Sequence, residues 1–138
     1  MWDYEHVAET TVAPKALWAV WADIEAWSQW SPGIAEIKVN GPFKAGTTFA
    51  MIPAPGEEPI NMRLSEVVDG EGFTDECDFG GAVVTTVHRL EPLDDGGTRV
   101  TYRTEITGAQ ADEIGPQIGP DITADFPDVV SALIARAS

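Results

Sequence analysis

The sequence predicts an α+β fold in which an antiparallel sheet of about seven strands packs against one long C-terminal helix. Between residues 34 and 107, short runs of strand-forming residues alternate with Gly- and Pro-rich turns, which is typical of consecutive hairpins. From residue 112 to residue 137, apolar residues recur at steps of three and four, so one side of a long helix is apolar. Because a sheet of this length needs one apolar face covered, we expect the helix to lie on it.

The 138-residue chain has the size of a single domain, which we expect to span residues 1–138. It carries 8 Lys and Arg against 23 Asp and Glu, giving a formal net charge of −15. This charge repels phosphate backbones and anionic membrane surfaces, so nucleic acid is not expected as a partner. Hydrophobic residues make up 43% of the chain, which is enough for a packed core.

The single cysteine, Cys77, excludes an internal disulfide and fits a reducing compartment. The first residues form neither a basic start nor an apolar run, and we expect no signal peptide. No window approaches the roughly 20 apolar residues of a membrane span, so we expect no integral membrane segment. Together these features predict a cytoplasmic protein.

The N-terminal quarter predicts one strand followed by two short helices. Residues 4–12 are rich in strand formers. Pro14 suits the first turn of a helix that runs to about Ala22, and Asp23 can cap a second helix that ends before residues 31–33. Four of the five tryptophans fall between Trp18 and Trp30. They either plug the open end of the sheet as core or form the aromatic wall of a ligand pocket, and one ring can do both.

The central part predicts a six-stranded meander, with strands at 34–40, 47–52, 60–68, 72–79, 82–90 and 98–107. The segment 53–59 contains three prolines, cannot join a ladder of backbone hydrogen bonds, and is expected to lie outside the sheet. In the C-terminal helix, Pro127 predicts a break near Phe126. Either Asp125 starts a new helix with Pro127 in its first turn, or one helix bends there.

Alternation of residue types assigns the inner face of the last three strands. The expected inward sets are Phe73, Asp75, Cys77 and Phe79; Val84, Thr86, His88 and Leu90; and Val100, Tyr102, Thr104 and Ile106. Asp75 and His88 therefore point into an apolar interior.

The order of these elements resembles the helix-grip fold of the START-related superfamily (SRPBCC), specifically its polyketide cyclase/dehydrase-like branch. The resemblance is carried by residues 13–21, 23–33, 41–49, 88–100 and the closing helix with Pro127, which together span nearly the whole chain. It implies a curved sheet wrapped around the long helix, with a deep apolar cavity between them. It transfers no catalytic residue, because the branch shares no catalytic motif that matches this chain position by position.

The expected cavity defines a set of candidate ligand-binding residues: Trp27, Trp30, Met62, Leu64, Phe73, Asp75, Thr86, His88, Tyr102, Thr104, Ile118, Ile122 and Phe126. Arg63 and Glu66 are further polar groups on central strands that we expect to reach the interior. If His88 and Asp75 meet, the carboxylate would orient the imidazole as a general base, with Tyr102 as a further acid/base candidate. The alternative is that His88 is a hydrogen-bonded core residue and Tyr102 a core ring.

No metal site or cofactor site is expected. The two histidines and the cysteine lie on separate strands without short ligand spacing, and no Gly-rich loop leads from a strand into a helix. Cys77 has no cationic neighbour in the sequence and is expected to be inert.

Three functions remain open. The first and favoured one is binding of a small hydrophobic molecule, lipid-like or polyketide-like, with the 53–59 loop and the start of the long helix as a gate. The second is a polyketide aromatase/cyclase that uses acid/base residues of the cavity. The third is a protein-interaction module with a closed core, which would show an exposed apolar patch. No feature of the sequence specifies the oligomeric state.

Overall fold

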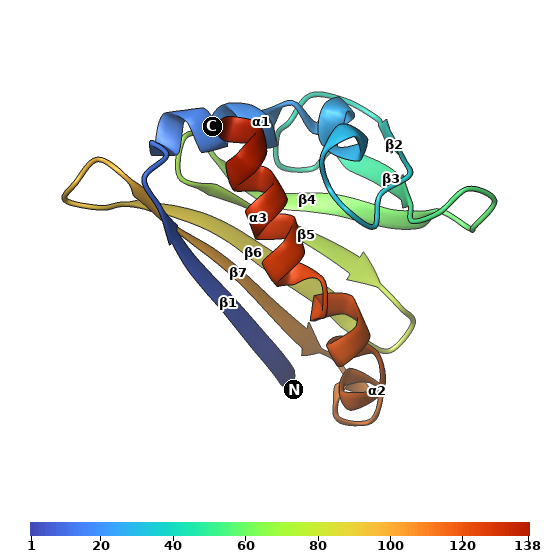
Figure 1. The fold of residues 1–138 in the computed structure, drawn as a ribbon. Coiled ribbons are helices and arrows are strands. Elements are labelled where there is room, and N and C mark those ends of the chain that lie inside the picture. The colour runs from blue at the N-terminus through green and yellow to red at the C-terminus, as the bar shows by residue number, and fades with distance from the viewer.

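The computed structural model describes all of residues 1–138 as one seven-stranded sheet and four helical segments (Figure 1). Their bounds are β1 Trp2–Thr10, α1 Pro14–Ala22, the 3₁₀ helix η1 Ile24–Gln29, β2 Glu36–Val39, β3 Thr48–Ile52, β4 Ile60–Val68, β5 Gly72–Asp78, β6 Val83–Pro92, β7 Thr98–Thr107, α2 Ala111–Thr123 and α3 Phe126–Ala137. None of the helices combines the length and apolar character that crossing a bilayer requires.

The sheet is antiparallel throughout, with strand order β1-β7-β6-β5-β4-β3-β2. The six strands from β2 to β7 form the expected meander, and β1 pairs with the last of them. In Figure 1 the sheet curves and α3 crosses one of its faces diagonally, with α1 lying near the C-terminal end of α3. The helix-grip fold expected from the sequence is confirmed.

The long C-terminal helix is broken, as Pro127 predicted. α2 ends at Thr123 and α3 begins at Phe126, with Asp125 preceding it and Pro127 in its first turn. Proline has no backbone N–H and its φ is fixed near the helical value, so it fits where the first turn would leave that group unpaired. Of the two expected arrangements, the structure has the one in which a new helix starts at Asp125.

The second short helix differs from its expected form. It is a 3₁₀ helix, and although Asp23 occupies the residue before it, the Asp23 side chain makes no capping hydrogen bond. The helix η1 is only six residues long, and the tighter 3₁₀ winding is common in such short pieces.

A face of α2 that carries small residues packs against Trp2 of β1. A Cβ atom at Gly119 would lie 2.6 Å from two ring atoms of Trp2, and one at Gly115 would lie 2.5 Å from the Trp2 Cβ atom. Glycine at both positions therefore lets the helix approach the indole closely. Ile114, Ile118 and Ile122 of α2 pack against a second apolar cluster, which Ala82, Val84, Ile106 and Ala111 form.

The inner face of β5, β6 and β7 is as alternation predicted, with one exception. Eleven of the twelve residues expected to point inward are buried. The exception is Phe79, which is 46% exposed because β5 ends at Asp78, one residue before it, although Phe79 still lines the cavity described below. The strand alternation on which the expectation depended does not reach that position.

Candidate ligand-binding cavity

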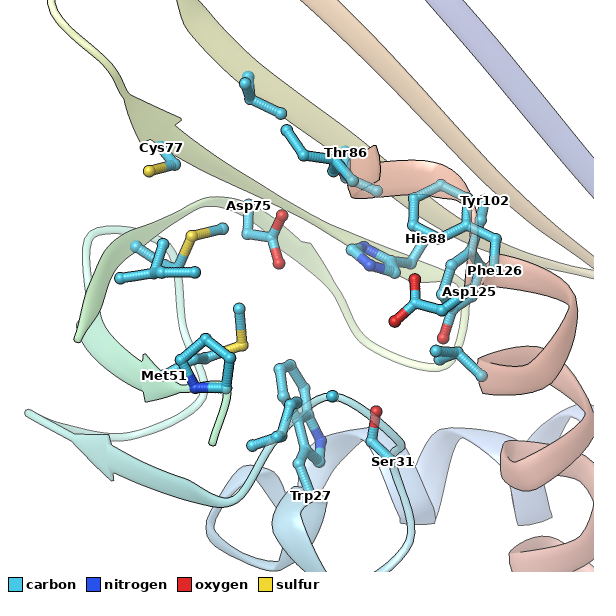
Figure 2. A pocket seen from close by; sticks show the side chains of 18 of the residues that line it. Trp27, Ser31, Met51, Asp75, Cys77, Thr86, His88, Tyr102, Asp125 and Phe126 are labelled. Atoms are coloured by element: carbon cyan, nitrogen blue, oxygen red, sulfur yellow. The ribbon is translucent and has the colours of Figure 1, made fainter. Parts of the chain in front are cut away.

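A cavity of about 410 Å³ lies between the inner face of the sheet, the η1 helix and the junction of α2 with α3. Hydrophobic residues make up 15 of the 24 that line it. Its volume is within the range of roughly 300–1,000 Å³ typical of small-molecule sites. Figure 2 shows the side chains of several polar residues directed into this space: Asp75, His88, Tyr102 and Asp125. The core is therefore hollow on this side rather than closed.

The register of the sheet places one row of ring-bearing residues across the inner face. Phe73 of β5 pairs with His88 of β6, and His88 pairs with Tyr102 of β7. The Phe73 and His88 rings are stacked, with centroids 4.0 Å apart, and the Tyr102 ring meets His88 edge-on at 4.6 Å. Directly opposed cross-strand residues have the shortest Cβ separations in a sheet, so these rings support one another.

The neighbouring row on the same face, two residues away on each strand, is polar. Asp75 pairs with Thr86, and Thr86 pairs with Thr104. The hydroxyl oxygens of Thr86 and Thr104 are 2.9 Å apart and hydrogen-bonded to each other. Asp75 and His88 are thus diagonal neighbours, which in an antiparallel sheet lie roughly 7–8 Å apart and do not share a hydrogen bond.

His88 is buried, 8% exposed, and its tautomer is set by the backbone. The Nδ1 atom lies 3.2 Å from the Phe73 carbonyl oxygen, which can only accept, so Nδ1 carries the proton and donates it. The other nitrogen, Nε2, is then left as an acceptor. Burial lowers the pKa of His88 from 6.5 to about 3, so the imidazole is neutral at physiological pH. Asp75 therefore does not orient the imidazole through Nδ1, as the sequence-based hypothesis proposed, because the Phe73 carbonyl binds that atom.

The Tyr102 hydroxyl accepts a hydrogen bond from a tryptophan, which holds it in place. The Trp21 indole Nε1 donates to the Tyr102 hydroxyl oxygen over 3.2 Å, in a fully buried contact. No other side chain or backbone group bonds this hydroxyl, so its own proton is free for a ligand in the cavity. Burial raises the pKa of Tyr102 well above its usual value of 10, which keeps the phenol protonated.

Asp75 is an acid with no partner in the protein. It is 6% exposed and lines the cavity, yet no hydrogen bond or ion pair reaches its carboxyl group. Burial raises its pKa from 3.8 to about 7, because the apolar surroundings disfavour the charged form. Near neutral pH this group therefore exists as comparable amounts of carboxylic acid and carboxylate.

One side of the cavity wall is formed where the helix break meets the loop after η1. Asp125, between α2 and α3, lies against Gly33, where a Cβ atom would be 3.1 Å from its Oδ2 atom. Partial burial raises the pKa of Asp125. Pro53 is the only residue of the 53–59 loop on the cavity wall. α2 contributes to this wall through its end, at Asp121 and Ile122, and not through its start, which was expected to form part of a gate.

Ten of the thirteen residues expected to bind ligand lie on the cavity wall: Trp27, Trp30, Met62, Phe73, Asp75, Thr86, His88, Tyr102, Ile122 and Phe126. Leu64, Thr104 and Ile118 do not line it. Leu64 and Thr104 are fully enclosed, the first in the main apolar core and the second behind Thr86, and Ile118 packs on the second cluster.

The expectation that Arg63 and Glu66 reach the interior is wrong, since both are exposed. Arg63 forms an ion pair with Glu76 on the outer face of the sheet. A register shift between Leu64 and Glu66 marks a bulge in β4, after which Val67 is the residue that packs against the core. A bulge reverses the alternation, so Glu66 turns outward.

Two polar features of the cavity were not predicted from the sequence. Trp21 belongs to the tryptophan cluster that was expected to form core or a pocket wall, but its hydrogen bond to the Tyr102 hydroxyl was not predicted. Asp125 was considered only as a helix start. The sequence feature that could have indicated its role is the nearby Pro127, which breaks the helix. A helix break over a sheet exposes backbone and side chains that a continuous helix would cover. No three of the His, Cys, Asp and Glu side chains gather into a metal-binding set.

Comparison with solved structures shows the same architecture in proteins of low sequence identity. The structure of Ara h 8.0201 has a TM-score of 0.79 at 13% identity, covering 98% of this chain and 96% of that one. Norcoclaurine synthase from Thalictrum flavum has a TM-score of 0.73 at 17% identity, covering 96% of this chain and 86% of that one. The di-domain ARO/CYC StfQ from the steffimycin biosynthetic pathway has a TM-score of 0.78 at 11% identity, with 98% of this chain matching 50% of that one.

These likenesses show that the chain has the helix-grip fold. The chain matches the family described as polyketide cyclase/dehydrase and lipid transport over residues 1–137, and it belongs to that family. None of the curated proteins is detectably similar in sequence.

Proposed function

We propose that this protein binds a small hydrophobic molecule in the cavity between the sheet and the C-terminal helices. The observation that carries the proposal is an apolar-lined space of about 410 Å³ into which unpaired polar groups are directed. A core built only for stability would fill such a space with side chains, because protein interiors are close-packed. Membership of a family that includes lipid transport proteins supports the same reading.

The polar groups of the cavity would orient the ligand rather than supply most of its affinity. His88 offers an acceptor at Nε2, Tyr102 offers a hydroxyl proton, and Asp75 offers an acid that has no partner in the chain. A few fixed donors and acceptors in an apolar wall are the usual means by which such sites select among hydrophobic molecules.

Native mass spectrometry of the protein as purified from cells tests this proposal. We expect an adduct of a few hundred daltons that disappears when the same sample is denatured. The Val84→Trp variant places an indole in the cavity and should lose the adduct. Val83→Trp makes the same change at the neighbouring residue on the opposite face of β6 and should retain it. An adduct that survives in Val84→Trp would place the ligand elsewhere.

A second candidate function is an aromatase/cyclase-type reaction on a polyketide-like substrate. It is favoured by the position of Asp75, which lines the cavity without a partner in the chain and whose pKa burial raises to about 7, near the optimum for proton transfer at neutral pH. His88, with a pKa of about 3, is too weak a base for this role. Turnover of a polyketide substrate that Asp75→Asn abolishes and His88→Gln retains would support it, whereas turnover unaffected by Asp75→Asn would exclude Asp75 as the catalytic acid/base.

A further inference from the structure

The charges of the cavity wall are all negative. Among its 24 residues there is no lysine or arginine, and there are three aspartates, Asp75, Asp121 and Asp125. Figure 2 shows the carboxyl groups of Asp75 and Asp125 directed into the same space from different sides, with the His88 imidazole between them. The whole chain adds to this field, since its net charge is −15.

Asp75 differs from its neighbour in sequence by having no cationic partner. Glu76, on the outer face of β5, is paired with Arg63 of β4. Asp75, on the inner face, has neither an ion pair nor a hydrogen bond although it is 94% buried. A buried carboxylate without a partner is costly, so a position of this kind points to a charge supplied from outside the chain.

The remaining wall also favours a cation. Trp27, Trp30 and Phe126 line the cavity together with Tyr102, and the faces of such rings attract positive charge. His88 contributes Nε2 as an acceptor, since its Nδ1 proton is held by the Phe73 carbonyl. The wall thus combines an acid, an acceptor and aromatic rings, with no fixed cation to compete.

We propose that the cavity selects a hydrophobic molecule carrying a protonated amine, whose ammonium group is bound by Asp75. The inference rests on the proposed function, because it specifies the chemistry of the ligand at the same site. The ammonium group donates hydrogen bonds to the Asp75 carboxylate and to His88 Nε2, and the apolar body lies against the aromatic wall. A neutral ligand offers no opposite charge to stabilise the Asp75 carboxylate, and an anionic ligand is repelled by that carboxylate.

The test compares three probes with the same apolar frame, 2-(1-naphthyl)ethylamine, 2-(1-naphthyl)ethanol and 1-naphthylacetic acid, by isothermal titration calorimetry at neutral pH. We expect the amine to bind at least tenfold more tightly than the alcohol, and the acid to bind most weakly. Asp75→Asn should weaken amine binding at least tenfold while leaving the alcohol within about threefold, which also shows that the cavity of the variant is intact.

The matched control is Asp78→Asn, which removes the same charge from an exposed residue of β5. It should leave amine binding nearly unchanged. Equal affinities for amine and alcohol would overturn the inference and leave the proposed function standing. Equal losses of amine affinity in Asp75→Asn and Asp78→Asn would also overturn it, since the preference would then come from net charge alone. If no probe binds, the inference fails, and the native mass measurement decides the proposed function separately.

Discussion

Replacing Asp75 with asparagine should change how the stability of the protein depends on pH. Burial raises the pKa of Asp75 from 3.8 in the unfolded chain to about 7 in the folded protein. Between these values the unfolded chain has lost this proton and the folded protein retains it, so the unfolded state binds fewer protons. The stability that Asp75 contributes therefore falls as the pH rises from about 4 to about 7.

The magnitude follows from the two pKa values. Each tenfold change in proton concentration between them is worth about 1.4 kcal/mol, so the full loss is about 4 kcal/mol. Between pH 5 and pH 8 the contribution of Asp75 to the unfolding free energy falls by about 3 kcal/mol. Asparagine is nearly isosteric and cannot ionise, and it removes this loss. The unfolding free energy of Asp75→Asn should thus rise relative to that of the unchanged protein by about 3 kcal/mol over this interval.

His88 has the opposite effect and makes the comparison more specific. Burial lowers its pKa from 6.5 to about 3, so between these values the unfolded chain binds a proton that the folded protein does not. Its contribution to stability therefore increases as the pH rises from about 3 to about 6.5. In the unchanged protein the Asp75 and His88 contributions oppose each other between about pH 4 and pH 6.5. In Asp75→Asn the unfolding free energy should therefore increase with pH over this range, because only the His88 contribution remains. In His88→Gln it should decrease with pH, because only the Asp75 contribution remains.

Urea unfolding monitored by tryptophan fluorescence, at several pH values from 5 to 8, measures these differences. Both proteins carry the same other carboxylates, so the difference between them isolates Asp75. Parallel stability curves for the unchanged protein and Asp75→Asn would refute the assignment of Asp75 as a buried, unpaired acid. A higher pKa for His88 in the folded protein, seen by NMR titration, would show instead that His88 and Asp75 form an ion pair.

Three further outcomes follow from specific contacts. Tyr102→Phe removes the acceptor of the buried Trp21 N–H and should cost about 1–3 kcal/mol of unfolding free energy, measured by urea titration, with Tyr4→Phe on the more exposed β1 position as a control near zero. Gly119→Ala should destabilise by about 1–3 kcal/mol because its methyl group meets the Trp2 ring, although alanine normally favours a helix. In a Trp2→Ala background the same change should be neutral or stabilising, and a loss that persists there would contradict the clash. Val84→Trp should lower the affinity for the naphthyl alcohol at least tenfold, whereas Val83→Trp should leave it unchanged.

Much of the fold could be predicted because local signals agree with one another. Glycine and proline mark nearly every turn, and the predicted bounds of β4 and β7 match the structure. Alternation placed Asp75, His88 and Tyr102 on the inner face, since a strand has a period of two whatever its neighbours are. Pro127 predicted the helix break because its effect on the backbone is local.

The parts of the site that could not be predicted depend on how strands and helices meet. The register that puts His88 opposite Phe73 and Tyr102, and Asp75 opposite Thr86, is determined by turn geometry and by packing across strands. That register explains why Asp75 and His88 are diagonal neighbours without a shared hydrogen bond. Glu66 was misplaced because a bulge leaves no clear sequence signal and reverses the faces after it.

The indole N–H signals of the five tryptophans provide the most direct test that the cavity is a ligand site. Trp21, Trp27 and Trp30 line it, while Trp2 packs against α2 and Trp18 lies beside a separate surface hollow. In ¹H–¹⁵N NMR spectra recorded as 2-(1-naphthyl)ethylamine is added, we predict saturable shifts for the signals of Trp21, Trp27 and Trp30, with the Trp2 signal unmoved. Shifts confined to Trp18, or no shifts at any indole, would contradict a ligand site in this cavity.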